Sequence, residues 1–327
     1  MATIPVIDVA PARRGERLDT VGRAIDAACR EVGFVTIVGH GIAPAVVGDL
    51  TAAAQAFFAL PDATKATIAM PGGGRAWRGW FPLGAELTAG RPDGKEGIYF
   101  GTDLPADDPR VRAGTPLHGP NRYPAEPPGM RRAVEAYLAA VTALGQDVLR
   151  AMAVGLGLDA DWFVRELTAD PLVLFRIFRY PPVSPGALDE TWSVGEHTDY
   201  GLITLLPQDD ADGLEVHGPA GWIAVPSRPG AFVVNLGDML ERMTRGRWVS
   251  TSHRVRNLSG RDRLAFPLFL DPGWDVEVPI VPGLGAGATD AAARWDGQAV
   301  TAWDGTYGSY VLDKVAKVFP ELAAEVQ

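Results

Sequence analysis

Cysteine, lysine and long apolar runs are all scarce in this chain of 327 residues. Cys29 is the single cysteine, so no disulfide can form within the chain, and this favours a reducing compartment. No stretch approaches the roughly 20 apolar residues that a membrane-spanning helix needs, and the first residues lack the apolar run of a signal peptide. We therefore expect a cytoplasmic protein without a membrane partner.

Positive charge is also in short supply. The net charge is -10, and only four of the 30 basic residues are lysines. A chain with this balance is a poor ligand for the phosphate backbone, so we expect no nucleic-acid partner. The 47% hydrophobic and 21% charged residues are ordinary for a globular enzyme large enough to bury a substantial core.

The first part of the chain, residues 1–150, is predicted to be mixed helix and strand. Apolar residues at helical spacing predict helices near 18–32, 44–60 and 134–152, and a β-rich run covers 34–38. Residues 71–128 are rich in glycine, proline and arginine and are too long for a plain connector. We interpret them as a lid loop over a pocket, although their aromatic residues would equally pack a loop onto the body of the protein.

The second part, residues 151–327, has a different pattern. Short β-like runs recur from about 171 to 270 with turn residues between them, which favours a sandwich or barrel of antiparallel strands. The residues after about 300 are predicted to be helical again.

His197, Asp199 and His253 are the residues with the clearest chemistry. Two histidines and one carboxylate are the ligand set of a non-haem Fe(II) site that keeps positions open for oxygen chemistry. His197 and Asp199 are two residues apart, so on a strand both would project from one face. His253 can return to the same site from another strand of an antiparallel double sheet.

Arg263 follows the second histidine by ten residues and adds a cation. If its side chain points into the barrel, it needs an anion, and a guanidinium fits a carboxylate well. Tyr180 closes another predicted strand, and its phenol would assist in binding the same anion.

The order of several motifs resembles the isopenicillin N synthase-like family of Fe(II)- and 2-oxoglutarate-dependent oxygenases, over nearly the whole length. The matching segments are Pro5–Asp8, Gly33-Phe34, Gly39–Gly41, Asp93–Glu96, His197–Gly201, Leu205-Leu206, Gly213–Val216, Asn235–Asp238 and Ser250–Val255.

The resemblance implies a mainly β fold with flanking helices, in which a double-stranded β-helix (jelly-roll) core follows an N-terminal α/β extension. It implies Fe(II) held by His197, Asp199 and His253, with 2-oxoglutarate and O2 as co-substrates. Arg263 and Tyr180 would hold the far carboxylate of oxoglutarate. The enzyme would hydroxylate, desaturate or cyclise a small molecule, with release of succinate and CO2.

One departure from the family pattern concerns oxoglutarate. Members usually have Arg-x-Ser here, whereas this chain has Arg263-Leu264-Ala265. The missing hydroxyl leaves open an oxidase of isopenicillin N synthase type that uses no oxoglutarate. A catalytically inactive metal-binding jelly-roll protein is the second alternative.

The substrate and the oligomeric state are not readable from the sequence. The candidate wall residues combine arginines, which suit a carboxylate-bearing substrate, with aromatic rings, which suit a flat or apolar one. They are Arg78, Trp80, Phe81, Glu86, Arg176, Phe178 and Phe266. We expect structural roles for His40, His118, His217 and Arg254, a helix-capping role for Asp238, and a bracing role in the lid for Lys95 and Glu96.

Overall fold

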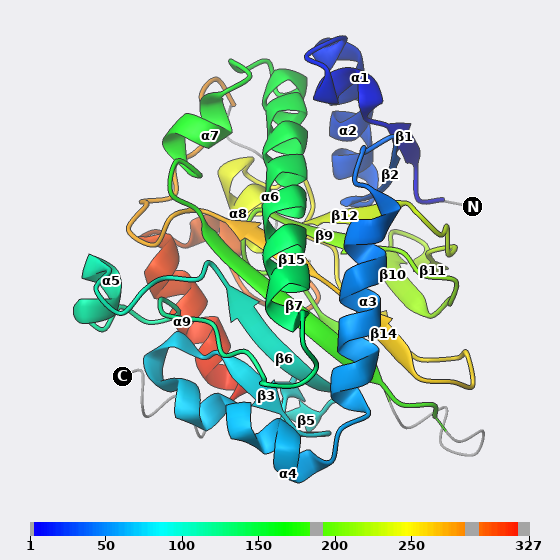
Figure 1. The fold of residues 1–327 in the computed structure, drawn as a ribbon. Helices are drawn as coiled ribbons and strands as arrows, with labels where there is room; N and C mark the ends of the chain where they lie inside the picture. The colour runs from blue at the N-terminus through cyan, green and yellow to red at the C-terminus, as the bar shows by residue number, and fades with distance from the viewer. Residues whose placement is uncertain (1–2, 184–191, 285–293, 320–327) are drawn as a thin grey trace.

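Two β-sheets form the centre of the computed structural model, which describes residues 3–183, 192–284 and 294–319 (Figure 1). Within these residues the major sheet has the strand order β1-β2-β12-β9-β15-β7-β6-β3, with β14 also paired to β7. The minor sheet has the order β11-β10-β13-β8, and β4 and β5 form a separate hairpin. The strands are β1 (Val6–Asp8), β2 (Phe34–Val38), β3 (Gly79–Phe81), β4 (Leu87–Thr88), β5 (Arg91–Pro92), β6 (Glu96–Gly101), β7 (Leu172–Tyr180), β8 (Val194–His197), β9 (Ile203–Pro207), β10 (Leu214–Gly218), β11 (Gly221–Ala224), β12 (Phe232–Leu236), β13 (His253–Val255), β14 (Arg263–Ala265) and β15 (Leu268–Asp271).

The pairing is that of a jelly-roll core. Every strand pair among β7 to β15 is antiparallel, and only the pair β1–β2, in the N-terminal part, is parallel. The mainly β fold with flanking helices that the sequence predicts is therefore confirmed. The helices are α1 (Ala10–Arg13), α2 (Leu18–Glu31), α3 (Pro44–Phe58), α4 (Asp62–Lys65), α5 (Pro109–Arg112), α6 (Met130–Gly155), α7 (Trp162–Glu166), α8 (Asp238–Met243) and α9 (Tyr307–Val318).

Helix α6 covers the outer face of the major sheet and packs against α2 and α3 (Figure 1). Its apolar residues recur at helical spacing, and Val134, Tyr137, Val141 and Leu144 are all fully buried. Among the described helices it alone is long and apolar enough to cross a membrane by length and composition. Its packing against β15 and β9 accounts for that composition.

Helix α2 ends at Glu31, close to the predicted end near residue 32, and Gly33 follows its C-cap. This glycine has a φ of +66°, and a Cβ at this position would lie 2.1 Å from the carbonyl oxygen of Val249. Only glycine combines the left-handed conformation with such a close approach. The chain can therefore turn directly from α2 into β2, which pairs with β1 and β12 at one end of the major sheet.

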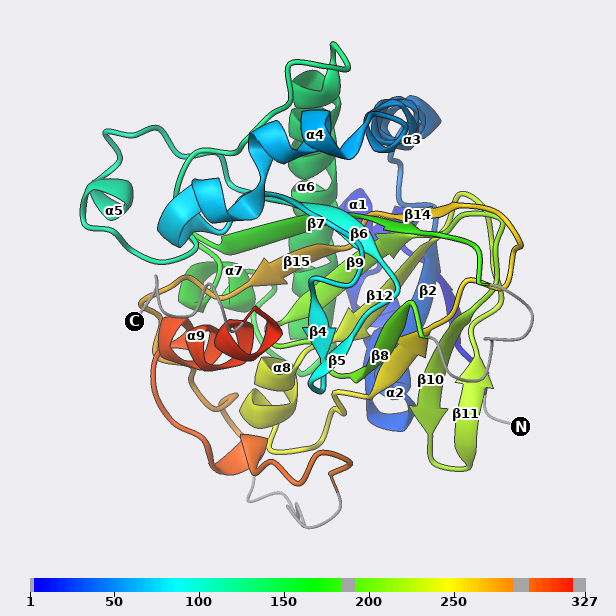
Figure 2. The same cartoon turned by 90° about the horizontal axis from the view of Figure 1, so that it is seen from below.

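Residues 71–128 differ from the expected lid loop. Strands β3 and β6 lie in this stretch and extend the major sheet beyond β7, with the register Trp80–Ile98 and Tyr99–Arg176. The hairpin β4–β5 lies outside the two sheets, between α9 and β8, and α5 projects from the body on the loop that follows β6 (Figure 2). The stretch is therefore largely part of the body of the protein. The sequence does not show this, because strands of three and six residues are too short to be recognised among so many glycines and prolines.

Candidate active site

His197 and His253 lie directly opposite each other on two neighbouring strands of the minor sheet. His197 ends β8, His253 begins β13, and the two residues are register partners. Directly opposed residues of an antiparallel pair project from the same face, and the two ring centroids are 4.2 Å apart.

Asp199 reaches the histidines from a different position than the sequence indicates. It lies beyond the end of β8, so it does not share a strand face with His197. Instead it makes an isolated parallel bridge with Gly237, which directly follows β12 of the major sheet. A Cβ on Gly237 would lie 2.3 Å from the carbonyl oxygen of Gly201, so the absence of a side chain permits this crossing between the sheets.

The ligand atoms of the three residues converge. The Nε2 atoms of His197 and His253 lie 3.9 and 4.0 Å from Oδ1 of Asp199. The three candidate ligand atoms lie within 4.8 Å of one another, a grouping that can hold a metal ion. Nδ1 of His197 lies 2.8 Å from the carbonyl oxygen of Gly195, and Nδ1 of His253 lies 3.2 Å from that of Thr251. When Nδ1–H donates to these carbonyls, both Nε2 lone pairs remain available to a metal.

Asp199 is held in a comparable way. Its Oδ2 accepts hydrogen bonds from Thr204 Oγ1 at 2.5 Å and from Asn235 Nδ2 at 2.6 Å, which leaves Oδ1 for a metal. Burial acts to raise the pKa of this carboxyl, but the two histidines and the two hydrogen bonds outweigh it and lower the pKa. Burial, with the neighbouring His197, lowers the pKa of His253 to about 4. Asp199 and His253 are thus presented as a carboxylate and a neutral imidazole, the forms that bind metals.

These residues line a cavity of about 530 Å³ between the two sheets, a size typical of small-molecule sites. The expected residues Tyr180, Glu86, Arg176 and Phe178 also line it. Residues of the hairpin β4–β5 and of α9, two elements that lie next to each other in Figure 2, also line the cavity.

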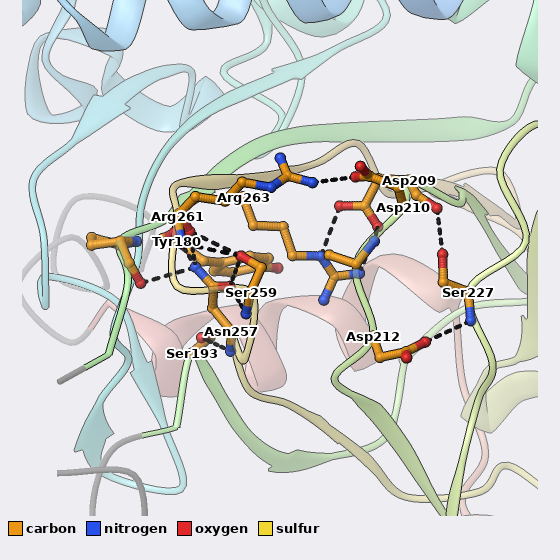
Figure 3. A network of polar contacts seen from close by, with 12 residues as sticks. Tyr180, Ser193, Asp209, Asp210, Asp212, Ser227, Asn257, Ser259, Arg261 and Arg263 are labelled. Atoms are coloured by element: carbon orange, nitrogen blue, oxygen red, sulfur yellow. Dashed lines mark hydrogen bonds and ion pairs between the residues drawn. The ribbon is translucent and has the colours of Figure 1, made fainter. Parts of the chain in front are cut away.

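Arg263 and Tyr180 lie opposite each other on β14 and β7, and both are buried. Tyr180 lines the cavity, but Arg263 is not among the residues that do. The Arg263 guanidinium bonds Asp209, from Nε to Oδ2 at 2.9 Å and from Nη2 to Oδ1 at 3.2 Å (Figure 3). Its Nη1 is buried and has no hydrogen-bond partner among the described residues. The position of Asp209 could not be anticipated from the sequence, and it leaves a single donor nitrogen of Arg263 for a further anion.

Asn257 fixes the end of β7 beside this pair. Its side-chain amide donates to the carbonyl oxygens of Tyr180, Pro181 and Arg261, at 2.9, 3.1 and 2.6 Å (Figure 3). Burial raises the pKa of Tyr180 to about 12, so its hydroxyl stays protonated and able to donate. Ala265 lines the cavity two residues after Arg263, and no hydroxyl is present at that position.

Four of the expected wall residues do not line the cavity. Arg78 is 1% exposed and donates to the carbonyl oxygen of Leu117, and the Trp80 indole donates to Glu96. Phe81 packs on Phe319 and neighbouring rings, and Phe266 faces Tyr137 of α6. These side chains brace β3, β6 and α6 rather than contact the cavity.

Several polar residues differ from the roles that the sequence indicates. The Asp238 side chain does not cap α8; it accepts hydrogen bonds from Ser250, Arg294 and Tyr310. Lys95 lies on the cavity wall, although Glu96 braces β3 and β7 as expected. Other expected structural roles agree with the contacts of His40, which bonds Gly230; His118, which bonds Pro116; His217, which packs on Trp222; and Arg254, which pairs with Glu215.

Comparison with known proteins agrees with this geometry over both halves of the chain. Residues 4–126 match the family described as non-haem dioxygenase in morphine synthesis N-terminal, and residues 170–272 match the 2OG-Fe(II) oxygenase superfamily. A probable iron/ascorbate oxidoreductase of Dictyostelium discoideum is 42% identical, with 94% of this chain and 91% of the relative covered. The chain belongs to the 2OG-Fe(II) oxygenase superfamily.

Two further relatives bear on the co-substrate of this oxygenase. A 2-oxoglutarate-dependent dioxygenase of Monascus ruber is 37% identical over 83% of this chain and 85% of its own length. The crystal structure of a full-length Neurospora crassa protein in complex with alpha-KG and thymine has a TM-score of 0.79 at 27% identity, with 96% of each chain covered. The protein is therefore an Fe(II)- and 2-oxoglutarate-dependent oxygenase, as the sequence predicts.

Proposed function

We propose that His197, Asp199 and His253 hold the Fe(II) ion of this oxygenase. The observation that supports this most strongly is the set of spare lone pairs. Each side chain directs its second polar atom to a protein partner and keeps one atom free for the metal. Two nitrogens and one oxygen leave further coordination positions for exogenous ligands.

Arg263 and Tyr180 are proposed to hold the far carboxylate of 2-oxoglutarate. The buried, unpartnered Nη1 of Arg263 supports this role, because a guanidinium N–H without an acceptor is costly in a protein interior. The protonated hydroxyl of Tyr180 supplies a second donor on the cavity wall. Asp209 orients the Arg263 guanidinium and offsets part of its positive charge. Binding of the oxoglutarate carboxylate therefore relies on directed hydrogen bonds as well as on attraction between opposite charges.

The substrate is proposed to be a small molecule that enters beside the hairpin β4–β5. The cavity volume and its position between two sheets support this, as does the thymine complex of the Neurospora crassa protein. Bound iron would activate O2, which would take two electrons from oxoglutarate, with release of succinate and CO2, and two from the substrate. The residues of the chain hold both groups, exclude water and orient the substrate.

The single, buried Cys29 supports a cytoplasmic location.

The proposal is tested by anaerobic titration of the protein with Fe(II) and 2-oxoglutarate. We expect a visible charge-transfer band that is absent from the His197→Ala variant, and succinate formation once O2 is admitted. Bound iron without such a band would instead support the oxidase that uses no oxoglutarate. Absence of bound iron would contradict the proposed ligand assignment. Binding of Co(II) or Zn(II) at the same residues would then support the inactive metal-binding alternative.

A further inference from the structure

Two charged side chains that line the cavity, Arg176 and Glu86, contact the same tyrosine, Tyr99. Arg176 on β7 is the register partner of Tyr99 on β6, and its guanidinium carbon lies 3.4 Å from the centre of that ring. The hydroxyl of Tyr99 donates to Oε1 of Glu86 at 2.7 Å. Tyr99 therefore holds a cation and an anion at fixed positions on the cavity wall.

Arg176 has no counter-ion among the described residues. It is 6% exposed, and its recorded hydrogen bonds run from Nη1 to the carbonyl oxygens of Phe100 and Phe175, at 3.4 and 3.2 Å. None of the described carboxylates forms an ion pair with its guanidinium. A buried cation of this kind is stabilised when an anion pairs with it, and the cavity is the side from which an anion can come.

The neighbouring buried carboxyl, Asp271, does not fill this role. It also lines the cavity, but its side chain accepts a hydrogen bond from Tyr307 at 2.6 Å. Burial raises the pKa of Asp271 to about 7, so a large part of it is uncharged near neutral pH. The cationic guanidinium of Arg176 thus remains available to a ligand.

Glu86 presents the opposite charge in excess. It is 7% exposed, and its Oε2 is buried without a hydrogen-bond partner. The ammonium of Lys95 lies 3.3 Å from that oxygen, but it also pairs with Asp93 at 2.8 Å. One ammonium between two carboxylates leaves a net negative charge and an oxygen able to accept from a ligand N–H.

Both groups lie near the metal-binding residues. Arg176, Glu86 and Tyr200 line the same cavity as His197, Asp199 and His253. A ligand that contacts Arg176 and Glu86 together is held beside the iron site.

We propose that the substrate is an amino acid, with its carboxylate on Arg176 and its ammonium on Glu86. This inference rests on the proposed function. A zwitterion satisfies both charged groups at once, whereas a simple acid adds no hydrogen-bond donor to Oε2 of Glu86 and a simple amine leaves Arg176 without an anion. The remaining part of the cavity, bounded by Phe178, Phe269 and Val311, takes the side chain.

The test uses the full chain with Fe(II), 2-oxoglutarate and ascorbate, and a panel of matched triads. Each triad contains an amino acid, the acid that lacks its amino group, and the amine that lacks its carboxyl group, and the panel spans charged, polar, aliphatic and aromatic side chains. We expect at least one amino acid to raise succinate formation above the substrate-free rate and to yield an oxidised product by mass spectrometry. Its two analogues should have kcat/KM values lower by about ten- to a hundredfold, the effect of losing a charge-assisted hydrogen bond.

Variants assign the two contacts. Arg176→Gln should raise KM for the amino acid by about tenfold or more and remove its advantage over the amine, and Glu86→Gln should remove its advantage over the acid. Arg261→Gln, which removes an exposed cation that pairs with Asp210 outside the cavity, is the charge-matched control and should leave both ratios unchanged. Circular dichroism of each variant separates a lost contact from a lost fold.

The outcomes distinguish a failure of the amino-acid assignment from a failure of the proposed function. A protein that shows the charge-transfer band and substrate-free succinate formation, but is stimulated by no amino acid more than by its analogues, overturns the amino-acid assignment alone. Equal stimulation by the acid or by the amine overturns it as well. Absence of both the band and the succinate overturns the proposed function itself.

Discussion

The two ends of the cavity differ in how their polar atoms are satisfied. At the metal end, Nδ1 of each histidine and Oδ2 of Asp199 have protein partners, and only the atoms needed by an ion remain free. At the substrate end, Arg176 has no carboxylate partner among the described residues, and Oε2 of Glu86 has no hydrogen-bond partner, although the Lys95 ammonium lies 3.3 Å from it. The metal end is therefore built for one fixed geometry, whereas the substrate end is completed by its ligand.

The difference also appears in the elements that supply the residues. Strands β8, β9, β12 and β13 carry or support the metal ligands, and they belong to both sheets of the jelly roll. Glu86 lies in the loop before β4, and α9 supplies further wall residues. Rigid strands position the metal ligands and their hydrogen-bond partners, because a small displacement of a metal ligand has a large effect on function.

The largest expected effect comes from removing a metal ligand. Asp199→Ala should weaken Fe(II) binding by about a thousandfold or more and abolish succinate formation, because the two remaining imidazoles supply no anionic donor. Anaerobic titration with Fe(II), or with Co(II) as a spectroscopic substitute, measures the change. Asp212→Ala removes a carboxylate outside the cavity, which bonds the backbone of Ser227, and should bind the metal like the parent. Unchanged affinity in Asp199→Ala would contradict the ligand assignment.

Asp271, beneath the substrate end, should make stability depend on pH. Burial raises the pKa of this carboxyl from 3.8 to about 7 in the folded protein. The stability that this group contributes is complete below the unfolded pKa and is lost as pH rises through about 7. Each pH unit in this window costs about 1.4 kcal/mol, so Asp271→Asn should gain roughly 2–3 kcal/mol relative to the parent between about pH 5 and 7. Urea unfolding at several pH values measures this gain, and a constant difference between the two proteins would refute it.

The partners of Asp199 should have an intermediate effect. Thr204→Val and Asn235→Ala each remove a donor to Oδ2, and such supporting contacts are typically worth about 10- to 100-fold in metal affinity. The two substitutions share one acceptor, so the double variant should lose less than the sum of the two free-energy changes. Ser227→Ala, whose hydroxyl bonds the backbone of Asp209, is a control for a lost hydroxyl. Metal affinity equal to that of the parent in both variants would show that Asp199 needs no such support.

The smallest expected effect concerns the co-substrate. Ala265→Ser restores a hydroxyl on the cavity wall beside Tyr180, and it should lower the dissociation constant of 2-oxoglutarate by up to about tenfold, as expected for one hydrogen bond to a charged group. The charge-transfer band reports the constant directly. Fe(II) affinity without oxoglutarate should stay constant, which separates a local contact from a general change. Weaker oxoglutarate binding in this variant would show that the smaller alanine is needed for the fit.

The sequence identifies the ligand types at the metal end more readily than their placement. His197, Asp199 and His253 could be recognised because few residue types bind Fe(II). That Asp199 lies beyond β8 and bridges to Gly237 could not be predicted, since it depends on how two sheets separated in the chain approach each other. Strand β8 itself was missed, because four residues with the sequence Val-Gly-Glu-His show no alternation of apolar and polar positions.

The positions of the arginine side chains also could not be predicted from the sequence. Arg78 and Arg176 have the same side chain and lie in comparable apolar contexts, yet only Arg176 reaches the cavity. The Arg78 guanidinium lies against Gly101, where a Cβ would clash with it, and bonds the backbone of residue 117, a contact across 39 positions. Arg263 is buried, and its partner Asp209 lies 54 positions away in the sequence, so this contact is again long-range. Long, flexible side chains take their direction from tertiary packing, which the local sequence does not record.

The strands β4 and β5 and the helix α9 carry no metal ligand, and this has a consequence for engineering. Residues 87–92 and 295–318 bound the substrate end of the cavity without supplying a metal ligand, so libraries confined to them should alter substrate preference while iron affinity is inherited from the parent. Arg294 marks the limit of such a library, since it donates to Thr198, between two of the ligands, at 2.8 Å. Two short segments therefore offer laboratory evolution a route to new substrates on an unaltered catalytic scaffold.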